Sequence, residues 1–126
     1  GFTSLIHGKY YHEETRATAS QVEKYPGGQY LVVRDMGEAE LVMDYIEARA
    51  GLPTTRAPLT RAAFLEKFAV SASDGFDPDV HLVRIGVANQ TTMLARESLA
   101  IGAAVGEAMA RAYGASHREA HFRTFD

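Results

Sequence analysis

The amino-acid sequence predicts a three-layer α/β domain, with a mostly parallel four-stranded sheet flanked by helices. Short β-branched or apolar runs alternate along the chain with longer segments of helical period, which is the order expected of βα units. The length of 126 residues, 46% of them hydrophobic, fits one domain that buries about two-thirds of its unfolded surface. We therefore expect residues 1–126 to form a single α/β domain.

The first strand is predicted at Thr3–His7, and Gly8 closes it. A helix is expected from Glu13 to about Tyr25, because Pro26–Gly28 cannot continue it. Its apolar edge is thin and consists of Ala17, Val22 and Tyr25.

The second strand is predicted at Tyr30–Val33, with a helix starting directly after it. Asp35 is a favourable N-cap, and Glu38 stands three residues later in the position of a capping box. Four apolar residues then repeat at helical spacing and should face the sheet: Met36, Ala39, Met43 and Ile46.

A loop and a second helix separate this unit from the next strand. Gly51–Pro58 is rich in Pro, Thr and Arg and has no periodicity, so it reads as a loop. The helix is expected from Thr60 to about Ala69, with an apolar side formed by Phe64, Leu65 and Phe68. Ser71–Pro78 reads as a turn-rich connector.

The third strand is predicted at His81–Ala88, and it runs directly into Asn89–Thr92. The longest helix follows and should end at Gly114, a good C-cap. Its apolar stripe is Leu94, Ile101, Val105, Ala108 and Tyr113. His121–Phe125 is the predicted fourth strand.

Composition excludes several classes of function. The chain has no cysteine, which excludes disulfides, a thiol nucleophile and any thiolate-held metal within it. Its net charge is −3 without a basic stripe, and no apolar run approaches the ~18 residues of a membrane span, so we expect neither a nucleic-acid nor a membrane partner. His117 and His121 are four residues apart but lie near an expected strand, so we assign no metal site.

Two junctions between a strand and a helix carry unusual polar residues, Lys9–Thr15 and Asn89–Thr92. In parallel sheets ligands bind beyond the carboxyl ends of the strands, and the N–H groups of a helix's first turn favour an anion there. His12 can donate a hydrogen bond to a phosphate oxygen, and Glu14 at the same loop suits a proton donor. Thr91 or Thr92 can cap its helix and also offer a hydroxyl to a ligand.

A structural explanation of the same residues stays open. Glu13 and Glu14 are common at helix starts, where they complement the positive end of the helix dipole. His12 can be a capping or surface residue, and threonines are ordinary N-caps. The residues alone therefore predict only an α/β module with an edge that favours anions.

At these junctions the chain resembles a known enzyme family. Residues 6–20, IHGKYYHEETRATAS, resemble the HGKYxHEETxATAS segment of hydroxymethylbutenyl diphosphate reductase, in its plant and cyanobacterial branch. Residues 86–94, GVANQTTML, resemble the GIANQTTML segment of the same family. Residues 64–68, 75–79 and 121–122 also fit, so the resemblance spans the chain in order.

The resemblance implies an activity and a cofactor. The family reduces (E)-4-hydroxy-3-methylbut-2-enyl diphosphate to isopentenyl and dimethylallyl diphosphates in the non-mevalonate isoprenoid pathway. It uses a [4Fe–4S] cluster held by three cysteines, within a fold of three similar α/β domains. The chain would be the middle domain with a short C-terminal extension into the next, and the cysteines would lie before Gly1 and after Asp126. The isolated chain should then be inactive.

The resemblance also assigns roles to residues and implies partners. His12 matches the histidine that binds the substrate diphosphate, and Glu14 matches the glutamate of the proton relay. Thr91 matches the threonine that bonds the substrate hydroxyl, while Gln90 belongs to the same substrate-binding motif. The implied partners are the flanking domains and a ferredoxin or flavodoxin donor, in a bacterial cytoplasm or the plastid stroma.

Three hypotheses remain at the level of sequence. The first is a fragment of this reductase, which predicts cysteines in the parent close to both ends of the segment. The second is a non-catalytic module that binds diphosphate or another anion, from a parent without those cysteines. The third is a purely structural domain, in which His12→Ala and Thr91→Val change stability alone. We favour the first, because the joint presence of His12, Glu14 and Thr91 would be a coincidence under the others.

Overall fold

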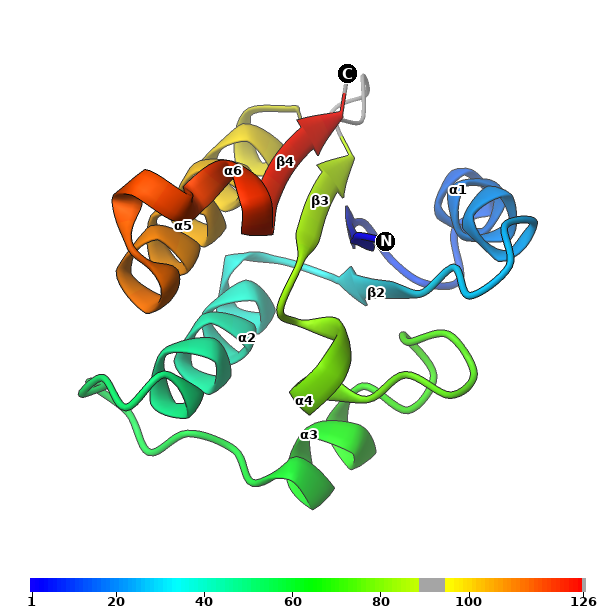
Figure 1. Ribbon diagram of the computed structural model, residues 1–126. Coiled ribbons are helices and arrows are strands. Elements are labelled where there is room, and N and C mark those ends of the chain that lie inside the picture. The colour runs from blue at the N-terminus through cyan, green and yellow to red at the C-terminus, as the bar shows by residue number, and fades with distance from the viewer. Residues whose placement is uncertain (89–94, 126) are drawn as a thin grey trace.

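The computed structural model describes residues 1–88 and 95–125 and confirms the α/β class (Figure 1). None of the helices in these ranges is both long and apolar enough to cross a membrane. The elements in chain order are β1 (Thr3–His7), α1 (Glu13–Glu23), β2 (Tyr30–Val33), α2 (Met36–Arg49), α3 (Arg61–Lys67), α4 (Pro78–His81), β3 (Ile85–Ala88), α5 (Ala95–Tyr113), the short 3-10 helix η1 (Ala115–His117), α6 (Arg118–His121) and β4 (Phe122–Phe125).

The four strands form one sheet in the order β2-β1-β3-β4, and every pairing is parallel. In the register, Ile6 of β1 lies opposite Val32 on one side and Ala88 on the other. Because both neighbours of β1 run in its direction, the carboxyl ends of β1, β2 and β3 meet at one edge of the sheet.

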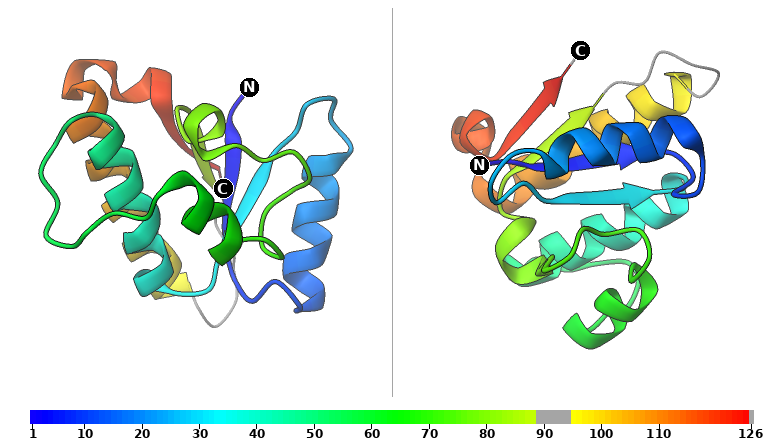
Figure 2. Two further views of the ribbon diagram at one scale, coloured as in Figure 1. Left: turned by 90° about the horizontal axis from the view of Figure 1, so that it is seen from below. Right: turned by 90° about the vertical axis from the view of Figure 1, so that its right-hand side faces the viewer.

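Helices cover both faces of the sheet, with α1 on one side and α2 and α5 on the other (Figure 2). The larger core lies beneath α2 and α5. There the inward side chains of the strands pack against the predicted stripes of both helices, including Ala39, Met43, Ile46, Ile101, Val105 and Ala108. Phe64 and Phe68 of the α3 segment complete this core and are essentially unexposed, as predicted.

The layer formed by α1 is thin, and its predicted apolar edge is wrong in part. Ala17 and Tyr25 are exposed, whereas Thr15 and Ala19 are buried and Val22 is half-buried. Spacings of four and three residues place Thr15, Ala19 and Val22 on one helical face. A face of small side chains lets α1 lie close to Ile6 and Val32.

The predicted capping of α2 is confirmed. The carboxylate of Asp35 accepts a hydrogen bond from the backbone N–H of Glu38 at 2.9 Å. Glu38 reaches back in turn and accepts from the N–H of Arg34 at 2.7 Å, one residue before the cap. This bond to Glu38 holds the pKa of the Asp35 carboxyl below its usual value, because it favours the ionised form.

The connector at residues 71–78 is more ordered than its composition suggests. Ala72 forms an antiparallel bridge with Leu31, supported by bonds from Val32 N to Ser71 O and from Ser73 N to Tyr30 O. The outer edge of β2 is therefore paired, which removes free backbone groups from that edge.

The predicted third strand begins too early. Residues 78–81 form α4, so β3 spans only Ile85–Ala88. Asp77 accepts a hydrogen bond from the N–H of Asp79 and caps this turn, and Pro78 suits the first helical position because it needs no N–H partner there.

Two further boundaries differ. The helix predicted at residues 60–69 is Arg61–Lys67, with Thr60 as its cap. His121 ends α6 instead of starting β4, and its Nδ1 lies 2.8 Å from the backbone oxygen of Val83. Gly114 adopts φ +92°, which L side chains rarely do, and it ends α5 as predicted.

Candidate functional site

The strand order predicts a crevice at the carboxyl ends of β1 and β3. The connection from β1 leads through α1 to β2 on one side, and the connection from β3 leads through α5 to β4 on the other. Loops that leave adjacent parallel strands toward opposite faces separate and open a crevice, the usual ligand site of such sheets. The two junctions singled out by sequence are the two that follow β1 and β3.

His12 and Glu14 both lie where the loop after β1 enters α1. His12 is the N-cap residue of α1 by backbone geometry, since its carbonyl accepts the first helical bond from Arg16 at 2.9 Å. Its side chain makes no capping bond and instead meets the ring of Tyr11 edge-on, with centroids 5.3 Å apart. His12 is thus an exposed N-cap residue whose side chain is not used for capping. Glu14, like Glu13, is exposed in the first turn of α1.

A close contact between Gly8 and Thr15 holds this loop. A Cβ atom on Gly8 would collide with Oγ1 of Thr15, which is buried in α1. The N–H of Gly8 also donates to the carbonyl of Val33 at 3.0 Å. The start of α1 thus rests directly on the end of β1, and His12 and Glu14 take their position from this contact.

The other predicted site residues, Gln90 and Thr91, lie outside the described residues, as do Asn89 and Thr92. Of the predicted site residues, the structure therefore describes His12 and Glu14, and both lie at the junction between β1 and α1. The second junction is bounded by the end of β3 at Ala88 and the start of α5 at Ala95.

A hollow of about 280 Å³ adjoins the first loop on its β2 side, between Gly8–Tyr11 and the start of α2. Arg34 and Lys67 line it, and both are partly neutralised by Glu38, at 4.0 Å and 3.4 Å. Lys9 lines it too and forms no ion pair within the described part of the chain. The loop therefore borders a mildly positive surface.

Sequence reasoning missed a buried polar pair at this edge. His7, the last residue of β1, is 2% exposed, and its Nδ1 lies 2.6 Å from the hydroxyl oxygen of Ser98 on α5. The sequence carries a signal for each residue, since both are polar and adjoin apolar residues. His7 ends a strand, and Ser98 fills the gap in the stripe between Leu94 and Ile101.

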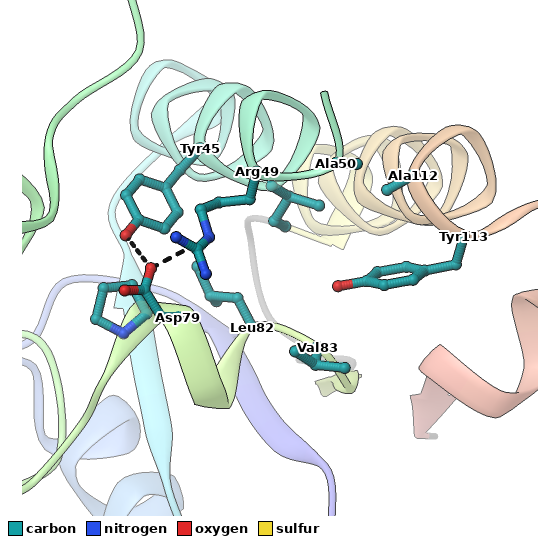
Figure 3. A pocket seen from close by; sticks show the side chains of 10 residues that line it. Tyr45, Arg49, Ala50, Asp79, Leu82, Val83, Ala112 and Tyr113 are labelled. Carbon is teal, nitrogen blue, oxygen red and sulfur yellow. Dashed lines mark hydrogen bonds and ion pairs between the residues drawn. The ribbon is translucent and has the colours of Figure 1, made fainter. Parts of the chain in front are cut away.

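A second cavity, of about 210 Å³, lies at the opposite edge of the sheet (Figure 3). The ends of α2 and α5 and the segment before β3 line it. Within it, Asp79 accepts a hydrogen bond from the phenol of Tyr45 and pairs with Arg49 at 3.3 Å. Burial and this bond raise the pKa of Tyr45 to about 12. These charged and polar groups bind one another and tie α4 to α2, and none of the predicted site residues lies there.

The chain supplies no thiolate ligand for an iron–sulfur cluster. It has no cysteine, and the described residues include no group of three or more His, Cys, Asp or Glu side chains that could hold a metal ion. Any thiolate ligands of a cluster would have to come from other parts of a larger protein.

Comparison with known proteins identifies close relatives. Over 125 residues, which make up 99% of its length, the chain is 49% identical to the 4-hydroxy-3-methylbut-2-enyl diphosphate reductase of Prochlorococcus marinus. It is 47% identical, over the same share of its length, to the reductases so named from Gloeobacter violaceus and Thermosynechococcus vestitus. Over nearly its whole length, the chain is therefore similar to proteins named as this reductase.

The similarity concerns one segment of each relative. The chain spans only 28%, 27% and 28% of the length of these three relatives. No protein-family model matches the chain, and no solved structure does. The resemblance inferred from the two junctions is confirmed at the level of the family.

Proposed function

We propose that the chain is the middle domain, with a short C-terminal extension, of a 4-hydroxy-3-methylbut-2-enyl diphosphate reductase, and that it supplies diphosphate-binding and proton-relay residues. The observation that carries the proposal is that His12 and Glu14 are both exposed at the start of α1, which follows the carboxyl end of β1. The reductases named above act on a diphosphate, and this edge offers the groups that a diphosphate needs.

The diphosphate would bind at the start of α1. His12 has a side chain free of capping bonds, so its ring N–H can donate to a phosphate oxygen. The N–H groups of the first helical turn point toward the same edge and favour a negative charge. Gln90 and Thr91 of the second junction would contact the rest of the substrate.

Glu14 would supply a proton. Loss of hydroxide from carbon is costly, and protonation of the leaving oxygen lowers that barrier by letting it depart as water. In this proposal the carboxyl of Glu14 gives its proton toward the substrate oxygen, and the hydroxyl of Thr91 bonds that oxygen and passes the proton on. This chain does not supply the electrons for the reduction. They would reach the complete enzyme from a ferredoxin or flavodoxin, in a bacterial cytoplasm or the plastid stroma.

The test uses the complete parent protein, loaded with its cluster and given (E)-4-hydroxy-3-methylbut-2-enyl diphosphate with a chemical reductant. We expect isopentenyl and dimethylallyl diphosphates as products. The variant His12→Ala should raise KM about 10-fold or more, since a charge-assisted bond to phosphate contributes about 1.5–3 kcal/mol. A parent protein that binds inorganic diphosphate but forms no product would favour the non-catalytic binding module.

A further inference from the structure

A buried histidine connects the end of β1 to the first turns of α5. The Nδ1 of His7 shares a hydrogen bond of 2.6 Å with the hydroxyl of Ser98, although the two residues are 91 positions apart in sequence. Its Nε2 lies 3.4 Å from Oε1 of Glu97, and it makes no hydrogen bond within residues 1–88 and 95–125. Glu97 is itself 40% exposed, so the pair extends from the core to the surface.

Packing alone does not explain a histidine at this position. Its neighbours on the same face of the sheet are Leu5, Val33 and Val87, and all three are buried and apolar. Burial of a polar group is unfavourable where its hydrogen bonds are incomplete, and within residues 1–88 and 95–125 Nε2 has no hydrogen-bond partner. An apolar side chain would fill the space at lower cost.

A hydrogen bond is directional, whereas apolar contact is not. Hydrophobic burial is non-directional, whereas the hydrogen bond between His7 and Ser98 fixes one point of α5 both along its axis and around it. Ser98 is buried and begins the inward line that continues through Ile101 and Val105. It therefore sets where the first turns of α5 lie relative to the end of β1.

We infer that His7 is a positioning residue of the proposed active site, which it serves by holding the start of α5 against the carboxyl end of β1. The inference rests on the proposed function. His12 stands five positions after His7 in the chain, and Gly8 continues the connection through its contact with Thr15. His7 thereby links the loop that carries His12 and Glu14 to the helix that forms the other side of the crevice.

The test compares four variants of the complete, cluster-loaded parent protein. Ser98→Ala removes the hydroxyl, and Ser98→Thr retains it as the matched control. His7→Leu breaks the bond, and the double variant His7→Leu/Ser98→Ala replaces both partners by apolar groups, which is close to neutral for stability. We measure Tm together with kcat and KM for (E)-4-hydroxy-3-methylbut-2-enyl diphosphate.

A positioning role predicts that activity and stability separate. The double variant should keep its Tm within a few degrees and lose about 10- to 100-fold in kcat/KM, the range expected when reacting groups are displaced by about 1 Å. Ser98→Ala should show a similar loss, and Ser98→Thr should restore most of it. A folded double variant with unchanged kcat/KM, or equal losses for Ser98→Ala and Ser98→Thr, would overturn the inference. If the unaltered parent forms no product, the proposed function itself fails.

Discussion

One methyl group added at Gly8 tests how the loop with His12 and Glu14 is held. The backbone of Gly8 lies outside the positive-φ region, so Gly8→Ala adds no backbone strain. Its new Cβ would instead collide with Oγ1 of Thr15, a side chain that is 3% exposed and cannot swing into solvent. Either α1 moves away from β1 or the contact stays compressed.

The expected cost follows from this collision. Overpacking by one methyl group in a filled site destabilises a protein by about 1–3 kcal/mol. For a chain of this size, 1 kcal/mol corresponds to about 4 °C, so Gly8→Ala should lower Tm by about 4–12 °C. Gly102→Ala is the matched control, because its Cβ would lie at an ordinary 3.6 Å from Cγ1 of Val87. It should raise stability by about 0.5–1 kcal/mol through better helix propensity.

Thermal unfolding followed by circular dichroism provides the assay. Thr15→Ala removes the colliding group, so the double variant Gly8→Ala/Thr15→Ala should be more stable than the sum of the two single changes predicts. The account of the loop would be refuted if Gly8→Ala had the same Tm as the unaltered chain. It would also be refuted if the double variant were no more stable than the sum of the two single changes predicts.

Three further predictions concern stability. Phe64→Ala should lower the free energy of unfolding by about 3–5 kcal/mol, because Phe64 is unexposed and its ring packs against that of Tyr45 at a centroid distance of 4.9 Å. A lower urea midpoint, with an unchanged dependence of the unfolding free energy on urea concentration, would confirm it. Asp35→Ala should cost about 0.5–2 kcal/mol at neutral pH through the lost cap. Since the folded-state pKa of Asp35 is lowered, its contribution is present above the unfolded value of 3.8 and is lost as pH falls through the folded pKa, so a cost that persists in strong acid would contradict this. For Tyr45 the pKa is raised, so its contribution is present below the unfolded value of 10 and lost as pH rises through about 12. In a pH titration followed by tyrosinate absorbance, Tyr45→Phe should show one fewer phenol ionising near pH 12 than the unaltered chain does.

Local signals in the sequence predicted much of the fold. The capping of α2 by Asp35 follows from side-chain chemistry within four residues, and the apolar stripes of α2 and α5 follow from helical period alone. The error at β3 has a local cause as well. The alternation at residues 81–84 resembles a strand, whereas Asp77 and Pro78 start a helical turn that ends at His81.

The rest depends on contacts between distant residues. The sheet order brings β3 beside β1, and no local pattern encodes that neighbour. The bond between His7 and Ser98 joins positions 91 residues apart, so it becomes visible only after the strands are arranged. For the site, sequence placed His12 and Glu14 at one junction correctly, but it did not show that the His12 side chain is free of the helix cap.

The central claim is that Glu14 passes a proton in the reduction of a diphosphate substrate, and one pair of variants tests it most directly. Glu14→Gln and Glu13→Gln each remove one exposed carboxylate from the first turn of α1, so both change the charge of the crevice equally. In the complete, cluster-loaded parent, Glu14→Gln should lower kcat by about 10²-fold or more with KM nearly unchanged, and Glu13→Gln should keep kcat within a few-fold. Normal turnover by Glu14→Gln would contradict the account.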